Sequence, residues 1–182
     1  MNQKLLCVIC ALSLGCTASL LADDEEEGGG GQFKANLSGY QEVPTLSTAS
    51  SGTVSIMLSS DQKTLTVTLT FTKLEGVATS AGLFFGATAT TGGMVAPICG
   101  GTKPACPTTA DGTVTTTIVA NDVLATPGQG IAAKDLAAVL RALESGTIYA
   151  NVLSMKYVAG EIRGQLGRGF GPSSGNPGRG HH

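Results

Sequence analysis

The sequence predicts an all-β fold, an antiparallel β-sandwich of about seven or eight short strands with one crossing helix. Val, Ile, Leu and Thr are concentrated in short runs that are separated by turn residues. Gly and Thr are abundant, aromatic residues are few and Trp is absent, a composition that favours strands and turns. Only one segment shows the apolar spacing of a helix. The 182 residues are enough for one domain with a sizeable core.

Strict alternation of apolar residues with threonines makes Thr64–Thr72 the clearest strand of the chain. Leu65, Val67, Leu69 and Phe71 point to one face and the threonines to the other. The polar segment Ser59–Lys63 is expected to be the hairpin turn before it. Less regular runs predict further strands, namely Phe33–Gly39, Gly52–Leu58, Ala78–Thr88 and Gly112–Val119. The Gly-rich stretch Thr91–Asp111 is expected to be a loop.

The predicted helix is Ala132–Glu144, because its leucines and valine recur at helical spacing and form one apolar face. Gly146 stands just beyond it, where a helix C-cap often falls.

The segment Gly146–Leu166 predicts two strands, each with one dry face and one polar face. In the first, Ile148, Ala150 and Val152 alternate with Tyr149, Asn151 and Leu153. In the second, Ile162, Gly164 and Leu166 alternate with Glu161, Arg163 and Gln165. Gly160 offers the backbone freedom for re-entry into the sheet, and Gly164 allows a close approach by another backbone or ring.

The N-terminal segment predicts an exported protein, and both ends of the chain are expected to lie outside the folded domain. Residues 1–22 have the charged start and short apolar run of a signal peptide, and residues 23–32 form an acidic, Gly-rich linker. Lipidation at Cys16 is the alternative to simple secretion, and only a lipid there would tie the protein to a membrane. We expect a folded domain over residues 33–167 and a disordered tail over residues 168–182. The expected location is secreted, periplasmic or at the cell surface.

The charge balance of the predicted domain argues against nucleic acid as a partner. The formal net charge of the chain is -2. Between Phe33 and Phe170 nine Lys or Arg residues face eight Asp or Glu residues, and no basic stripe is present.

Two cysteines lie inside the predicted domain, Cys99 and Cys106. In an oxidising compartment, two cysteines at this distance are expected to form a disulfide. The alternative is half of a metal site, which lacks two further ligands. The remaining cysteines belong to the targeting segment, so their C-x-x-C spacing is not read as a redox motif.

Two motifs carry a resemblance to a known family. The first is FKANLSGYQEVP at residues 33–44, and the second is G-x-x-Y-x-N-V followed by G-E-I-R-G-Q within residues 146–165. They resemble the opening and closing motifs of the CHRD domain, which was first named in chordin and is common in exported microbial proteins. The resemblance covers residues 33–167. It implies an immunoglobulin-like or superoxide-dismutase-like Greek-key sandwich, in a family whose functions are mostly unsettled.

The resemblance also reveals a difference. Many members of the family carry A-H-I-H in a middle strand and N-V-H near the end, and these histidines could hold a metal across the sandwich. In this chain the candidate ligand positions hold Gly82, Phe84 and Leu153. We therefore expect no metal and no cofactor, and an apolar patch where the histidines would lie. The only histidines of the chain are His181 and His182.

The polar motif residues are expected to have a structural role; they are Gln41, Glu42, Asn151, Glu161, Arg163 and Gln165. Arg163 carries a planar fork of donors, and an ion pair with Glu42 would join the two motifs. Ligand binding and catalysis are the alternatives. No nucleophile or histidine base accompanies the carboxylates within the predicted domain, so no catalytic residue is proposed.

Three functions compete. The first is a non-catalytic extracellular module with a structural or interaction role towards an unidentified protein or surface. The second is a metal-binding or dismutase-like redox protein that has lost its ligands. The third is a carrier of a small ligand such as a sugar or peptide, with a pocket between the sheets lined by Tyr40, Tyr149 and Tyr157.

Overall fold

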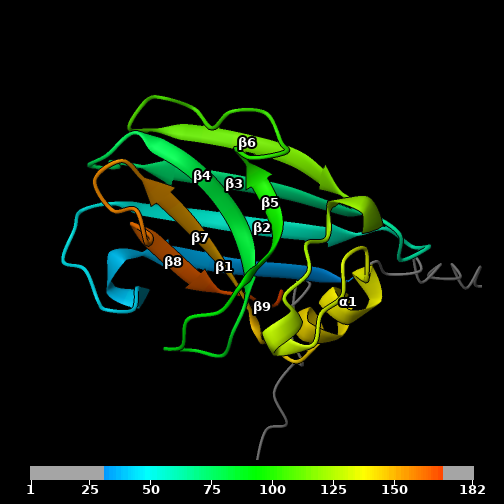
Figure 1. The fold of residues 1–182 in the computed structure, drawn as a ribbon. Coiled ribbons are helices and arrows are strands. Elements are labelled where there is room, and N and C mark those ends of the chain that lie inside the picture. The colour runs from blue at the N-terminus through cyan, green and yellow to red at the C-terminus, as the bar shows by residue number, and fades with distance from the viewer. Residues whose placement is uncertain (1–30, 170–182) are drawn as a thin grey trace, which may run out of the picture.

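The computed structural model describes residues 31–169, which form one antiparallel sheet of nine strands and a single α-helix (Figure 1). The strands are β1 (Gln32–Ser38), β2 (Ser51–Leu58), β3 (Leu65–Thr72), β4 (Ala78–Phe85), β5 (Met94–Cys99), β6 (Gly112–Ile118), β7 (Ile148–Ser154), β8 (Ile162–Gln165) and β9 (Gly167–Arg168). The helix is α1 (Leu136–Glu144), and the short 3-10 turns are η1 (Gly39–Gln41), η2 (Ala120–Asp122) and η3 (Pro127–Gln129). The predicted all-β fold is confirmed.

The sheet curls back on itself, so the molecule is both sandwich-like and nearly a barrel (Figure 1). The strand order is β5-β4-β7-β8-β1-β2-β3-β6, and β9 pairs with the outer part of β1. The first and last strands of this order approach each other. The amide of Leu124, which follows β6, donates to the carbonyl of Val95 in β5 at 2.8 Å. This closure leaves few unpaired edges.

The interior is filled by aliphatic side chains from both halves of the curled sheet. Leu65, Val67, Leu69 and Phe71 of β3 are all fully buried, and this confirms the apolar face predicted from their alternation with threonines. Burial of each such side chain is worth about 1.5–3 kcal/mol before the cost of ordering it. The hairpin between β2 and β3 is also as predicted, because Ser59 N donates to Thr64 O at 2.9 Å across its turn.

The helix begins four residues later than the apolar spacing predicted. Asp135 is its N-cap, and its side chain accepts a hydrogen bond from Ala138 N at 2.9 Å. Lys134, just before it, has a φ of 66°, which no helix continues through. At the other end Gly146 has a φ of 69°, as expected of a residue that ends a helix.

The prediction of a structureless loop over Thr91–Asp111 was wrong, because the loop contains strand β5. This strand is a short, almost continuously buried apolar run, so it lacks the alternation that identifies a half-exposed strand. It also contains Pro97, which an outer strand of the main order tolerates. The predicted disulfide follows it and is confirmed, with Cys99 and Cys106 joined over a Cα–Cα distance of 5.0 Å.

The boundary of the predicted tail also needs correction. Gly167 and Arg168 pair with Lys34 and Phe33 as strand β9, so the ordered domain extends beyond residue 167. The predicted signal peptide, the lipidation alternative at Cys16, nearly all of the linker, and His181 and His182 lie outside the described residues. Within residues 31–169, no helix is long and apolar enough to cross a membrane.

Candidate functional site

Arg163 is almost fully buried in β8, where it pairs with Ser38 of β1 and Asn151 of β7. Its Nη1 donates to Thr90 O at 2.7 Å and its Nη2 to Ala87 O at 3.1 Å. The predicted ion pair with Glu42 is wrong, because these two residues form no salt bridge among the described residues. The guanidinium fork holds two carbonyls of one loop instead of a carboxylate.

Tyr149 provides the base on which Arg163 lies. The guanidinium carbon is 3.5 Å from the centre of the Tyr149 ring, and the ring of Phe84 stacks on Tyr149 at 5.3 Å. The Tyr149 hydroxyl also accepts a hydrogen bond from Gly92 N at 3.1 Å. Arg163 and Tyr149 together therefore fix the loop of residues 86–92 between β4 and β5.

Gln165 holds both ends of the same region. Its Nε2 lies 3.0 Å from Gly86 O and 2.9 Å from Gly146 O, so it ties the loop after β4 to the start of β7. Its Oε1 is buried and has no hydrogen-bond partner among the described residues.

The apolar patch expected at the missing histidine positions is present at two of the three. Phe84 belongs to the stack on Tyr149, and Gly82 leaves room for Met94, because a Cβ there would lie 2.9 Å from Met94 Cε. Leu153 pairs with Ser80 and is only half buried. Gly82, Phe84 and Leu153 do not fit a copper or zinc ion, since none of the three has a side-chain atom that can donate an electron pair to a metal.

Glu161 is fully buried and has all the partners that a carboxylate needs. Its Oε1 accepts from Ser50 Oγ at 2.6 Å and from Glu75 N at 2.5 Å, and its Oε2 accepts from Gly76 N at 3.2 Å. These bonds fix the segment after β3 against the chain before β2. The polar face predicted for the second strand is thus buried at Glu161 and Arg163, and loop residues provide its hydrogen-bond partners.

Glu42 is buried as well, but its carboxylate is poorly satisfied. Its Oε2 receives only a long hydrogen bond of 3.5 Å from Asn151 Nδ2, and its Oε1 has no partner among the described residues. Asn151 Oδ1 also lacks a partner. Burial raises the pKa of Glu42 to about 7, although the charge of Arg163, the Asn151 hydrogen bond and the backbone amide of Val43 act in the opposite direction.

Gly160 is what allows Glu42 and Asn151 to come together. A Cβ at this position would lie 2.5 Å from Asn151 Oδ1 and 2.7 Å from Glu42 Oε1, and the φ of Gly160 is 140°. The backbone freedom and the close approach that the sequence assigned to Gly160 and Gly164 are confirmed. A Cβ on Gly164 would meet Asn36 O of the neighbouring strand at 2.4 Å.

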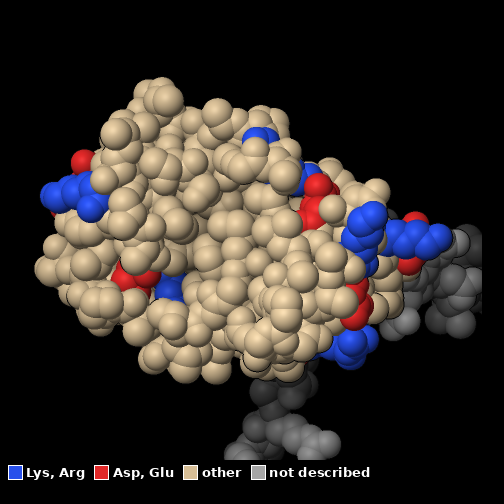
Figure 2. Space-filling model, viewed as in Figure 1, with Lys and Arg blue, Asp and Glu red and all other residues tan. Residues whose placement is uncertain are grey.

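These residues surround one small pocket of about 200 Å³, which we call the signature pocket. Its lining residues are Tyr40, Gln41, Glu42, Val43, Thr45, Thr88, Ala89, Arg163 and Gln165. The first motif forms one wall, and the fixed loop and β8 form the other. Figure 2 shows one acidic and one basic group next to each other, with uncharged residues around them, near the position of η1 and β8 in Figure 1.

Both motifs therefore meet in space, as their expected structural role requires. Gln41, Glu42, Arg163 and Gln165 all line the signature pocket. Gln41 is anchored by a hydrogen bond of 2.8 Å from its Nε2 to Asn36 O. Asn151 lies behind Glu42, and Glu161 lies apart with its own partners.

The three tyrosines proposed for a carrier do not share one cavity. Tyr40 lines the signature pocket, and Tyr149 is buried beneath Arg163. Tyr157 lines a neighbouring hollow of about 180 Å³ on the other side of Glu42. Its hydroxyl donates to Glu75 Oε2 at 3.0 Å.

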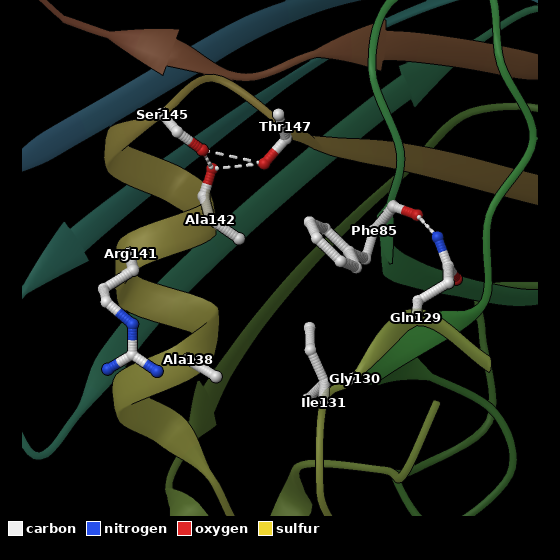
Figure 3. A pocket seen from close by; sticks show the side chains of 9 residues that line it. All are labelled: Phe85, Gln129, Gly130, Ile131, Ala138, Arg141, Ala142, Ser145 and Thr147. Atoms are coloured by element: carbon white, nitrogen blue, oxygen red, sulfur yellow. Dashed lines mark hydrogen bonds between the residues drawn. The ribbon is translucent and has the colours of Figure 1, made fainter. Parts of the chain in front are cut away.

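A larger pocket of about 380 Å³ lies between α1 and the chain around η3 (Figure 3). Figure 3 shows Phe85 and Ile131 facing Ala138 and Ala142 of the helix, while Arg141 extends along the helix. The unpartnered buried polar atoms of residues 31–169 all lie outside this lining. The larger pocket therefore offers apolar contact but no polar group that needs a ligand.

Within residues 31–169, no group of three or more His, Cys, Asp or Glu side chains is placed to hold a metal ion. The two cysteines are consumed by their disulfide, so the alternative of half a metal site at Cys99 and Cys106 is excluded in this structure.

Fold and site together define an all-β domain whose charged motif residues fix loops around one small pocket. The family model named CHRD domain matches residues 33–166 of the chain. The chain therefore belongs to the CHRD domain family, as the two motifs indicated. No curated protein and no solved structure matches the chain.

Proposed function

We propose that this protein is an exported, non-catalytic binding module that holds part of a surface or extracellular partner in the signature pocket. One observation carries the proposal. Glu42 lines the pocket, and its Oε1 is buried without a hydrogen-bond partner among residues 31–169, whereas the other motif carboxylate, Glu161, has three partners. A buried oxygen without a partner costs about 1–3 kcal/mol, and a ligand that donates to it recovers that cost.

The roles of the other charged residues favour binding over catalysis. Arg163 is engaged with Thr90 O and Ala87 O, and Glu161 is engaged with backbone amides, so both serve to fix loops. A general base needs a neighbouring nucleophile or substrate proton within reach. The linings of the two hollows beside Glu42 contain no histidine, cysteine or serine side chain.

Export is proposed from the signal peptide predicted over residues 1–22, and the disulfide supports it. Disulfides persist in oxidising compartments and are rare where thiols are kept reduced. The nearly uncharged face seen in Figure 2 also supports contact with a surface, because few charged groups would have to lose their water there.

The proposal is tested by binding to washed envelope and extracellular material of the producing cells. Thr45→Trp fills the pocket mouth with a bulky ring, and Thr45 is exposed and makes no side-chain hydrogen bond in the structure. Thr66→Trp is the matched control, because Thr66 is exposed on β3, outside the pocket lining. We expect retention of the wild type and of Thr66→Trp, and a loss of about tenfold or more for Thr45→Trp. Equal retention of all three proteins would refute the proposal.

A further inference from the structure

The signature pocket presents acceptor oxygens that lack donors. Glu42 Oε1 and Gln165 Oε1 are both buried and unpartnered among residues 31–169, and both residues line the pocket. No buried side-chain nitrogen of the described residues lacks a partner. A ligand that brings hydrogen-bond donors suits this lining better than one that brings only acceptors.

Charge in the pocket favours a ligand without net charge. Glu42 and Arg163 line the same small space, and the Arg163 charge acts on the Glu42 carboxyl. An ammonium ligand close to Glu42 would also meet the guanidinium, and a carboxylate ligand close to Arg163 would meet Glu42. A charged ligand of either sign is therefore attracted by one of these two residues and repelled by the other.

Arg163 adds donors to the acceptors. Two of its N–H groups are used by Thr90 O and Ala87 O, and a guanidinium carries five. A ligand that both donates and accepts at one position suits this lining best. Hydroxyl groups have that property, whereas a peptide group separates its donor from its acceptor.

The size and the rim of the pocket favour a single ring. Its volume of about 200 Å³ lies below the ~300–1,000 Å³ of sites for drug-sized ligands. Tyr40 lines the pocket with 64% of its surface exposed, and its hydroxyl lies 3.2 Å from Ser47 Oγ, which steadies the ring. An exposed aromatic face next to polar groups accommodates the C–H face of a ring whose edges carry hydroxyls.

We infer that the signature pocket binds one neutral sugar ring, with Glu42, Gln165 and Arg163 pairing with its hydroxyls and Tyr40 covering one face. This inference rests on the proposed function, for which it names the ligand class. In this arrangement, sugar hydroxyls donate hydrogen bonds to Glu42 Oε1 and Gln165 Oε1, and sugar oxygens accept hydrogen bonds from the Arg163 guanidinium.

The test is a nuclear magnetic resonance titration of the full ¹⁵N-labelled chain. The probes are a panel of neutral methyl hexopyranosides, with ethylammonium and acetate as charged comparisons. We expect at least one sugar to shift the amide signals of residues 40–43 and 86–89, with a dissociation constant of about millimolar for so small a ligand. Thr45→Trp should abolish these shifts, Glu42→Gln should weaken binding about tenfold, and Thr66→Trp should leave it unchanged.

Two outcomes would overturn the inference. One is the absence of localised shifts with every sugar of the panel, and the other is stronger binding of ethylammonium or acetate at the same signals. The envelope experiment separates these failures from failure of the proposed function. If retention still depends on Thr45 while no sugar binds, the pocket is a binding site for another ligand class and only the sugar inference fails.

Discussion

The guanidinium carbon of Arg163 lies 3.5 Å from the centre of the Tyr149 ring, while its two Nη atoms donate to carbonyls of the loop that Tyr149 also holds. A motif residue that looks suited to binding a carboxylate is thus used to shape a pocket wall. Among residues 31–169, the pocket-lining residues with an unpartnered acceptor oxygen are Glu42 and Gln165. This division between loop-fixing and ligand-facing residues underlies the predictions.

Arg163→Ala should destabilise the domain strongly. The change removes two hydrogen bonds from a buried charged group, each worth about 1.5–3 kcal/mol, and leaves Thr90 O and Ala87 O without those donors. We expect a loss of about 3 kcal/mol, which corresponds to a lower Tm by about 6–12 °C in a domain of this size. Arg163→Lys should recover only part, because an ammonium cannot reach both carbonyls in the plane of the ring. Thermal unfolding of Arg163→Ala within about one degree of the wild type would contradict the loop-fixing role.

Glu161→Gln should be costly although it preserves size. The amide group that replaces one carboxylate oxygen would bring a donor to Glu75 N or to Gly76 N, where an acceptor is needed. We expect a loss of about 2–3 kcal/mol in chemical unfolding. Glu75→Gln is the control, because Glu75 is exposed and its salt bridge with Lys156 is a solvent-screened surface pair that contributes little to stability. Equal stability of the two variants would argue against the assignment.

Glu42 should make stability fall as pH rises between about 4.5 and about 7. Its pKa in the folded protein is raised to about 7 from 4.5, so the folded state binds the proton more tightly than the unfolded chain does. The stabilisation is complete below the pKa that Glu42 has in the unfolded chain. It is lost as pH rises through the pKa that Glu42 has in the folded protein, and the free energy of unfolding falls by up to about 3 kcal/mol. The difference between the wild type and Glu42→Gln across this range isolates the effect, since other carboxylates cancel. A pH-independent difference would refute it.

Reduction of the Cys99–Cys106 disulfide should weaken the domain only moderately. The two cysteines are 7 residues apart, and closing so short a loop constrains the unfolded chain by about 2–3 kcal/mol. Cys99→Ser with Cys106→Ser, compared with the wild type under oxidising conditions, measures this difference. Mass spectrometry of the native protein provides the complementary check, and two free thiols there would exclude the bond.

The sequence identified most strands because their apolar alternation survives folding, as in Thr64–Thr72. It failed at β5, where burial on both faces removes the alternation, whereas the two strands predicted within Gly146–Leu166 are present as β7 and β8. Glu161 and Arg163 were expected to pair with groups on a neighbouring strand or loop, but the sequence did not identify these groups. Only the folded loops show that each of them is paired with backbone groups.

The candidate site was also partly predictable from the sequence. The two motifs identified Gln41, Glu42, Arg163 and Gln165, which do line one pocket. The pairing of Arg163 with Glu42 was predicted from their opposite charges alone. Its actual partners are the backbone carbonyls of residues 87 and 90, which no sequence pattern identifies. Tyr149 was taken for a pocket-lining residue because nothing in the chain order reveals that an arginine covers its ring.

The most direct measurement compares Glu42→Gln with the wild type at pH 8, where Glu42 is ionised, for both envelope retention and unfolding free energy. Because Glu42 faces the pocket without a partner, the variant should lose about tenfold or more in retention. Its stability should be equal to that of the wild type or higher by up to about 3 kcal/mol, since a buried charge is removed. Unchanged retention together with a loss of stability would contradict the account, because Glu42 would then belong with the loop-fixing residues.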